Sequence, residues 1–284
     1  FFLCPREYVL HYWDPKPTKK FNASAQMRMQ VGTDLHTYFQ NNVLGPMGIL
    51  WGEWFNTEEE CWHEGFHPDP EESIWAMQKQ VGSPWVFCEE TVWDPKSRIL
   101  GHLDGRVSKN KMEFLAKNLK LMKSGLPEAL KECEKVPDDE LVLCEIKSTG
   151  TFAFNGLTDV SKIPDYNKMQ ASIYQKLSGT SETIFLYVER DNLKLRGFSY
   201  EGESGWVKDA ERKAHKIWES IRDETLPESM MPCSSPSDKR AKGCAYKKEC
   251  WDTYDFKAWV AARRSEGEAN GRVFLELSEK CFDV

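Results

Sequence analysis

The stretch Leu141-Val142-Leu143-Cys144-Glu145-Ile146-Lys147 carries an acid and an amine two residues apart at the end of an apolar run. Side chains alternate across a β-strand, so Glu145 and Lys147 are predicted to project from the same face. Upstream, Ile99-Leu100-Gly101-His102-Leu103-Asp104-Gly105-Arg106 is typical of a second short strand. Asp104 precedes a glycine, where the backbone can bend or be closely approached. Two carboxylates on neighbouring strands can hold a hard divalent cation, and a lysine beside them can orient or deprotonate a water molecule.

These residues resemble the core of a known family. Asp104 followed by Glu145-Ile146-Lys147 is similar to the Asp…Glu-x-Lys core of the PD-(D/E)XK nuclease superfamily. Further motifs of the chain resemble the RecB-type branch, which contains the CRISPR-adaptation exonucleases and their phage-encoded relatives and whose nuclease core carries an iron-sulfur cluster. The resemblance covers roughly residues 1–252. It implies an α/β fold with a restriction-endonuclease-like mixed sheet flanked by helices, and a helical N- and C-terminal region held together by the cluster.

A long helix predicted from about Ser24 to Val43 carries Gly32 and His36 one turn apart on one face. A lone histidine on a helix is usually a packed or surface residue. The pattern Gly-Thr-Asp-Leu-His, however, resembles the family's G-x-x-x-H motif, whose histidine ligates the metal ion. Neutral imidazole is a suitable ligand for manganese or a similar ion.

A second helix, predicted from about Asp165 to Leu177, carries Gln170 and Tyr174 one turn apart. Such a pair is often an ordinary helix face, but it matches the family's Q-x-x-x-Y motif, which faces the active site and positions the scissile strand or Lys147. The resemblance implies that Mg²⁺ or Mn²⁺ is bound by His36, Asp104, Glu145 and the Ile146 carbonyl. The catalytic set that it implies is Lys147, Glu145, Asp104, Gln170 and Tyr174.

A strand is predicted over residues 86–93, in which Glu90 shares a face with the apolar Val86 and Val92. An acid on an otherwise apolar face needs a partner, because a buried unpaired charge is costly. Glu90 is therefore predicted as an accessory acid near the metal ion. The alternative is that Glu89 faces inward, which a shift of register by one residue would produce.

Four of the nine cysteines have unusual surroundings. Cys4 precedes a proline at the start of a predicted helix, and an N-terminal Cys-Pro-Arg is the first cluster ligand in the resembling family. Cys244 and Cys250 have the spacing of that family's last cysteine pair. The family often places a cysteine where this chain has Ala241, so Cys233 would substitute from farther away. The resemblance implies a structural 4Fe-4S cluster on Cys4, Cys233, Cys244 and Cys250, although four cysteines also suit structural zinc.

The remaining segments complete the predicted order of elements. Residues 71–80 and 206–221 are predicted as helices and residues 183–189 and 193–200 as strands, which suits a single α/β nuclease domain over residues 1–252. Residues 45–70 have no clear period and are predicted as an irregular or partly helical insertion. Residues 253–284 are predicted as a helix and a tail.

Residues 108–139 exceed a hairpin turn and are predicted as an insertion with a basic amphipathic helix followed by an acidic loop. The insertion is either an exposed decoration or a flap over DNA. The apolar stripe of its helix is formed by Met112, Leu115, Leu119 and Met122.

The net charge of −7 argues against a protein that coats nucleic acid uniformly, but it permits a local basic groove. Two basic clusters are either solvated faces or phosphate contacts. They comprise Lys109, Lys111, Lys117, Lys120 and Lys123, and Lys239, Arg240, Lys242, Lys247 and Lys248. No uniform apolar run reaches about 18 residues, and the first residues lack the order of a signal peptide, so we expect a soluble protein without membrane contact, in the cytoplasm of a prokaryotic host.

These observations predict a metal-dependent deoxyribonuclease. The resemblance implies exonuclease action on linear DNA, often from 5′ ends and often on single strands, and the family contains ring-shaped oligomers. The insertion and the altered cysteine spacing favour a phage recombination or DNA-degradation enzyme over a CRISPR-adaptation nuclease that trims spacer precursors. A rival from another class is a non-catalytic iron-sulfur or zinc scaffold that binds DNA or a partner protein through a decayed nuclease fold. The presence of all core residues argues against it.

Overall fold

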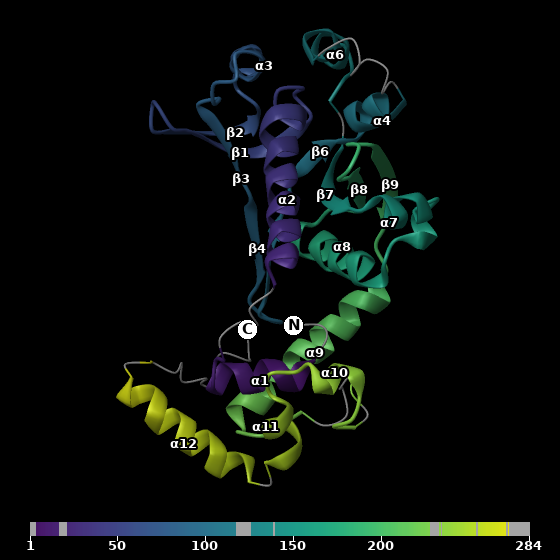
Figure 1. The fold of residues 1–284 in the computed structure, drawn as a ribbon. Helices are drawn as coiled ribbons and strands as arrows, with labels where there is room; N and C mark the ends of the chain where they lie inside the picture. The colour runs from purple at the N-terminus through teal and green to yellow at the C-terminus, as the bar shows by residue number, and fades with distance from the viewer. Residues whose placement is uncertain are drawn as a thin grey trace. The chain divides into compact units, whose positions relative to one another are not determined.

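The computed structural model describes residues 4–16, 22–117, 126–138, 140–227, 233, 235–253, 255–270 and 272. The chain forms two compact units, so the predicted single domain over residues 1–252 is divided between them (Figure 1). The sheet unit comprises Phe21–Trp93 and Leu100–Ser204. The cysteine unit comprises Phe1–Lys20, Asp94–Ile99 and Gly205–Val284.

A seven-stranded mixed sheet forms the centre of the sheet unit. The strand order is β2-β1-β6-β7-β8-β9, and β3 also pairs with β1. Strands β7 and β8 are parallel, and the other pairs in this sheet are antiparallel. The strands are β1 (Leu50–Asn56), β2 (Cys61–Phe66), β3 (Trp85–Cys88), β6 (Arg106–Ser108), β7 (Leu141–Thr149), β8 (Glu182–Glu189) and β9 (Leu195–Glu201). A separate two-stranded sheet joins β4 (Glu90–Asp94) and β5 (Ile99–Leu103).

Helices pack on both faces of this sheet, which confirms the predicted mixed α/β class (Figure 1). Val142, Cys144 and Ile146 of β7 are buried in one core, with residues of α2, η1, α4 and α6. A second core joins Phe185 and Tyr187 of β8 to residues of α7 and α8. The alternation of side chains along each strand thus supplies two apolar faces. The helices of this unit are α2 (Ala23–Phe39), α3 (Pro70–Gln78), α4 (Lys109–Lys117), α6 (Leu126–Cys133), α7 (Thr151–Gly156) and α8 (Asp165–Ser178), with a 3-10 turn η2 (Val160–Lys162).

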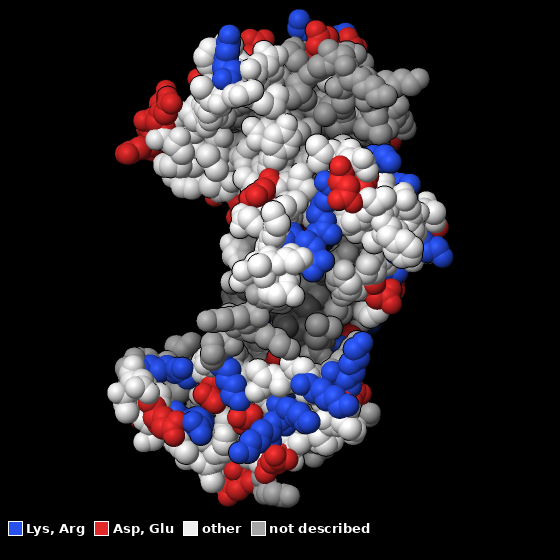
Figure 2. Space-filling model, viewed as in Figure 1, with Lys and Arg blue, Asp and Glu red and all other residues white. Residues whose placement is uncertain are grey.

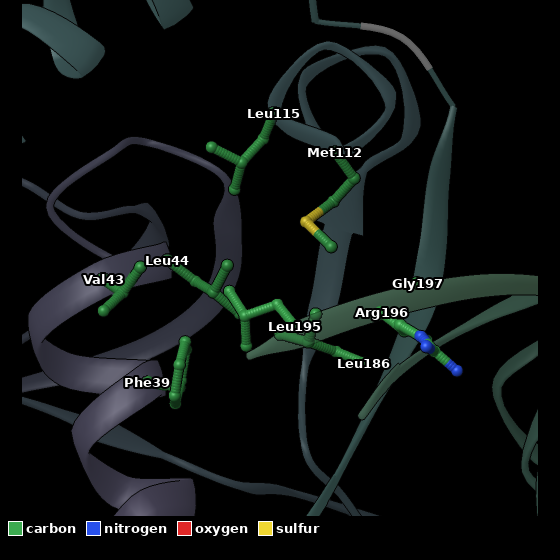
Figure 3. A pocket seen from close by; sticks show the side chains of 9 residues that line it. All are labelled: Phe39, Val43, Leu44, Met112, Leu115, Leu186, Leu195, Arg196 and Gly197. Atoms are coloured by element: carbon green, nitrogen blue, oxygen red, sulfur yellow. The ribbon is translucent and has the colours of Figure 1, made fainter. Parts of the chain in front are cut away.

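Helix α2 ends in a π-helical turn, η1 (Gln40–Leu44), in which the Gly45 N–H donates to the Gln40 carbonyl over 3.0 Å. Such turns are rare and often occur at functional sites. Here Val43 and Leu44 are buried and face an apolar cavity of about 190 Å³ (Figure 3). The residues that line this apolar cavity are Phe39, Val43, Leu44, Met112, Leu115, Leu186, Leu195, Arg196 and Gly197.

Two glycines permit close approach around β7. Gly105, which follows Asp104, has a φ of 148°, and a Cβ there would overlap the side chain of Leu50. Gly32 on α2 would place a Cβ 3.1 Å from the Ser148 Oγ, so glycine lets α2 lie against the end of β7. The prediction that the backbone bends or is closely approached at Gly105 is confirmed. Gly32, the glycine of the Gly-Thr-Asp-Leu-His pattern, is explained by the close packing of α2 against β7.

The cysteine unit joins the N-terminal helix to the C-terminal part of the chain. Its apolar core contains Val9, Trp13, Ile217, Ile221 and Val260. Polar contacts add to it: the Arg6 Nε donates to the Pro227 carbonyl over 2.7 Å, and the Tyr246 hydroxyl donates to the Asp14 carbonyl over 2.9 Å. The helices are α1 (Pro5–Trp13), α9 (Ser204–Arg222), α10 (Lys239–Lys242), α11 (Lys247–Asp252) and α12 (Phe256–Ala269).

Four predicted segments differ from the structure or lie wholly or partly outside the described residues. Residues 45–70 are not an irregular insertion, because they contain the β1–β2 hairpin. The predicted strand over residues 86–93 is two strands, β3 and β4, which belong to different sheets and are separated at Glu89. The 108–139 insertion contains the two helices α4 and α6, and its residues Leu119 and Met122 lie outside the described residues. The predicted tail from residue 273 also lies outside them.

Candidate metal centre

Asp104 and His36 form the centre of the candidate metal site. Asp104 follows β5 and is 9% exposed, and its Oδ2 accepts a hydrogen bond of 2.7 Å from the Ile146 N–H on β7. The His36 Nε2 lies 3.3 Å from the same oxygen. This nitrogen is buried and has no hydrogen-bond partner in the described part of the chain. A histidine nitrogen and a carboxylate oxygen that face each other without a hydrogen bond are suited to share a cation.

Glu89 completes a group of three candidate ligands. One ligand atom each from His36, Glu89 and Asp104 lies within 4.8 Å of the others. The Gln40 side chain, at the start of the π-helical turn, donates to the Asp104 carbonyl over 2.8 Å and to the Glu89 Oε1 over 3.4 Å. It thus positions two of the three residues. An imidazole and two carboxylates fit Mn²⁺ or Mg²⁺, which prefer oxygen ligands and accept imidazole.

Glu145 and Lys147 project together from β7, as the alternation predicted. The Lys147 Nζ lies 2.6 Å from the Glu145 Oε2 and donates to the Gln170 Oε1 over 3.3 Å. The Gln170 Nε2 in turn donates to the Tyr174 hydroxyl over 3.2 Å. The structure therefore brings together Asp104, Glu145, Lys147, Gln170, Tyr174 and His36. Their roles in catalysis and metal binding stay predictions, as does that of the Ile146 carbonyl.

Burial dominates the electrostatics of these groups. It raises the pKa of Asp104 to about 6 and, together with the charge of Asp104, the pKa of Glu145 to about 7. Burial also lowers the pKa of His36, which favours the neutral imidazole that a metal ion needs. For Lys147 burial opposes the charged form, but the carboxylates of Glu145 and Asp104 outweigh it and the pKa is raised. Lys147 thus carries its proton at neutral pH.

These shifts predict a steep pH dependence of metal binding. Binding requires the carboxylates of Asp104 and Glu145, whose pKa values of about 6 and 7 lie above their ordinary values. As the pH falls through 7 one carboxyl must lose a proton on binding, and below 6 both must. We expect the apparent affinity for Mn²⁺ to fall about tenfold between pH 7 and 6, and faster below pH 6. Calorimetry in two buffers of different ionisation enthalpy would count the protons released, and a constant affinity from pH 8 to 5 would contradict the assignment.

Glu90, predicted as the accessory acid, lies elsewhere. Its two oxygens accept hydrogen bonds of 2.9 and 2.7 Å from Arg106, whereas Glu89 lies beside His36. The prediction counted alternation along one continuous strand, but the chain leaves β3 at Cys88 and enters another sheet at Glu90. The alternative that Glu89 faces the site is the one that the structure supports.

The two neighbouring acids provide a matched pair of variants. Glu89→Gln is expected to weaken Mn²⁺ binding about tenfold, because it removes one charged ligand from a partly exposed position. Glu90→Gln loses an ion pair with Arg106, and we expect its Mn²⁺ affinity to stay within about twofold of the wild type. Titration followed by Mn²⁺ electron paramagnetic resonance measures both. Equal effects of the two substitutions would remove Glu89 from the ligand set.

The four predicted cluster cysteines all belong to the cysteine unit. Cys4 is close enough to Cys244 and Cys250 for electrostatic interaction, and Cys244 likewise to Cys233. The ligand atoms of His36, Glu89 and Asp104 lie within 4.8 Å of one another. Within the described ranges, no three of these sulfur atoms lie that close together. No cysteine cluster is therefore evident among the described residues, and the iron-sulfur cluster stays a prediction.

Hydrogen bonds reach three of these sulfur atoms. The Cys4 Sγ caps α1 and accepts from the Glu7 N–H over 3.4 Å, and the Cys244 Sγ accepts from the Tyr246 N–H over 3.4 Å. The Cys250 Sγ accepts from Arg6 over 3.8 Å. Donors of this kind stabilise thiolates and are part of the surroundings of iron-sulfur clusters. Burial nevertheless raises the pKa of the Cys4 and Cys244 thiols, so the hydrogen bonds offset the effect of burial only in part. A metal centre on these thiols stays a prediction.

The basic clusters divide into paired and exposed lysines. Lys109 pairs with Glu182 over 2.5 Å, and Lys111 is buried and pairs with Asp138 over 2.7 Å. The sequence could not show these distant partners. Lys117 has no described side chain, and Lys120 and Lys123 lie outside the described residues. In the second cluster the side chain of Arg240 is not described, Lys247 is half-buried, and the exposed lysines are Lys239, Lys242 and Lys248. Figure 2 shows basic side chains over the region of α10 and α11.

No protein-family model matches this chain, and no curated protein matches it. Among solved structures, the chain is similar to the crystal structure of a protein designated SSO0001. The two share 12% sequence identity, the match covers 75% of this chain and 72% of that chain, and the TM-score is 0.32. A likeness of this strength carries no argument about fold or function. No helix in the described ranges combines the length and the apolar character that crossing a membrane requires.

Proposed function

We propose that this protein is a metal-dependent deoxyribonuclease of the PD-(D/E)XK type. One observation carries the proposal: Asp104, Glu145 and Lys147 converge at the end of β7, with His36 on one side and Gln170 on the other. Two buried acids, a protonated lysine and a neutral histidine form the set that hydrolysis of a phosphodiester needs. The substrate proposed is linear or single-stranded DNA, cut from an end and often the 5′ end, in phage recombination or DNA processing.

The residues of the chain divide the work of the reaction. Asp104, Glu145 and His36, with Glu89, would hold the cation. When bound, Mg²⁺ or Mn²⁺ supplies a water of lowered pKa and neutralises charge on the phosphate. The Ile146 N–H fixes the orientation of Asp104, and Gln170 fixes that of the Lys147 amine.

Because the Lys147 amine is protonated, it would orient the attacking water and stabilise the negative charge that develops on the phosphate. It would not remove a proton from that water. Lys147 donates to Gln170, and Gln170 donates to the Tyr174 hydroxyl, so these two residues hold the lysine in place.

The same proposal assigns a structural 4Fe-4S cluster to Cys4, Cys233, Cys244 and Cys250. Phosphodiester hydrolysis transfers no electron, so the cluster would act as a cross-link between α1 and the segment around α11. Zinc on the same thiols is the alternative metal. Among enzymes, a CRISPR spacer-processing nuclease is the alternative context. The partners proposed are DNA and either further copies of this chain in a ring or a recombination protein.

The rival function is a non-catalytic iron-sulfur scaffold that binds DNA. The first experiment compares end-labelled linear DNA with a closed circle, using anaerobically purified protein with Mn²⁺ or with EDTA. Loss of the linear substrate alone, only with Mn²⁺, is expected, and the label released first gives the polarity. If neither DNA is cut with any divalent metal ion, the scaffold function replaces the nuclease. Binding through exposed lysines is expected to weaken steeply as salt is raised.

A further inference from the structure

A cleft lies beside Lys147 in the sheet unit. Its volume is about 630 Å³, and residues from the end of β7, from α7, from η2 and from α8 line it. Pockets of about 300–1,000 Å³ hold one ligand of drug size. A nucleotide has this size, whereas a base pair with both of its backbones is much larger. The cleft therefore has room for one nucleotide of a strand whose phosphate lies near Lys147.

The walls of the cleft are held by contacts within and behind them. The Arg196 Nη1 donates to the Phe154 carbonyl over 2.9 Å, and its guanidinium lies 4.6 Å from the centre of the Phe154 ring, which anchors α7. On the α8 side the buried Asn167 donates to the hydroxyl of the buried Tyr187 over 2.8 Å. A cleft with anchored walls loses little conformational freedom when a ligand enters.

The chemistry of the cleft suits a nucleotide. Lys147 and Lys162 supply two positive charges, and of the described residues that line it none is acidic. Tyr166 lines the cleft and is 63% exposed. Phe152 is 96% exposed and lies in α7 one turn before Gly156, which lines the cleft. Exposed aromatic rings beside lysines are the arrangement on which unpaired bases stack.

We propose that this cleft binds one unpaired nucleotide of the DNA strand, with its base on Tyr166 and Phe152 and its phosphate between Lys147 and Lys162. The proposal rests on the proposed nuclease function only in taking DNA as the ligand. It deepens that function because a paired base cannot enter without leaving its stack. Single strands and frayed ends are then the substrates, and Tyr166 is a residue that selects them.

Binding without cleavage tests the cleft directly. The probe is a short single-stranded oligonucleotide with a fluorescent adenine analogue at one end, added to the full chain in EDTA. Stacking on an aromatic ring quenches this fluorescence. We expect quenching with the wild type, about tenfold weaker binding by Tyr166→Ala, and wild-type binding by Tyr166→Phe, which keeps the ring. Because Tyr166 is exposed, its replacement leaves the core packing intact.

A second variant blocks the cleft. A Cβ at Gly156 meets no atom within 4 Å, so Gly156→Leu adds a side chain at the cleft without displacing neighbouring atoms. We expect at least a tenfold loss of oligonucleotide binding by this variant. The matched control is Gly82→Leu, which also enters open space but lies outside the cleft, and it is expected to bind as the wild type. Wild-type binding by both Gly156→Leu and Tyr166→Ala would overturn the proposal. Equal quenching by a fully paired duplex would do the same.

Cleavage assays separate this inference from the proposed function. If the oligonucleotide binds with the expected dependence on Tyr166 and Gly156 but no metal ion promotes cleavage, the cleft assignment stands and the nuclease fails. If Gly156→Leu cuts single-stranded DNA at the wild-type rate, the cleft assignment fails and the nuclease stands.

Discussion

Replacement of Lys147 by alanine is expected to lower the rate of DNA cleavage about 1,000-fold, which corresponds to about 4 kcal/mol of barrier. Two effects combine. The ammonium that offsets charge on the phosphate is lost, and Glu145 loses the cation 2.6 Å from its Oε2. The pKa of Glu145, raised to about 7 by burial and by Asp104, would rise further, so less of the carboxylate would be available to a metal ion.

DNA binding by Lys147→Ala is expected to weaken only a few-fold, because one phosphate contact among several is removed. Single-turnover cleavage and anisotropy of a labelled oligonucleotide measure the two effects separately. Lys176→Ala, an exposed lysine of α8, is the control and should match the wild type in both. Cleavage by Lys147→Ala within tenfold of the wild-type rate would contradict the assigned role.

Cys250→Ala is expected to remove the brown colour of anaerobically purified protein and much of its solubility. A cluster that joins Cys4 to Cys250 closes most of the chain into a loop, and loop closure alone then stabilises the folded state by about 5 kcal/mol. Loss of one ligand would release this cross-link between α11 and the N-terminal helix and leave only non-covalent contacts such as that of Arg6 with Cys250. Visible absorption, iron and sulfide analysis and thermal unfolding measure the effect.

Cys61→Ala is the matched control, since Cys61 is a half-buried cysteine on β2 in the other unit. It should keep both colour and stability. A colourless wild type that contains zinc and loses it in Cys250→Ala would assign the four thiols to zinc instead. A colourless wild type as stable as Cys250→Ala would exclude any metal on these cysteines.

The parts of the site that could be predicted from the sequence lie on regular elements. Alternation along β7 placed Glu145 beside Lys147, and helical spacing on α8 placed Gln170 beside Tyr174, and both pairs are in contact in the structure. In a strand or helix the spacing of two residues determines their direction. Glu89 was not chosen because it lies between two strands, where that relation is interrupted.

The β1–β2 hairpin was missed for a related reason. Its first strand has aromatic residues on both faces, so Trp51 and Trp54 do not produce an alternating pattern. Its turn, residues 57–60, lacks the glycine or asparagine that normally indicates a hairpin, and instead Glu60 adopts a φ of 53°. Strand pairing supplies the information that the local sequence lacks, because β1 is held between β2, β3 and β6.

The π-helical turn at Gln40–Leu44 restricts changes in the length of the chain. It holds one residue more than an α-helical turn, so deletion of a single residue would turn all of α2 by about 100° relative to strand β1. Either His36 would then leave Asp104, or Val43 and Leu44 would leave the apolar cavity. In a scan of one-residue deletions, this turn should therefore be as intolerant as any of the predicted metal ligands, although none of its own side chains is one of them.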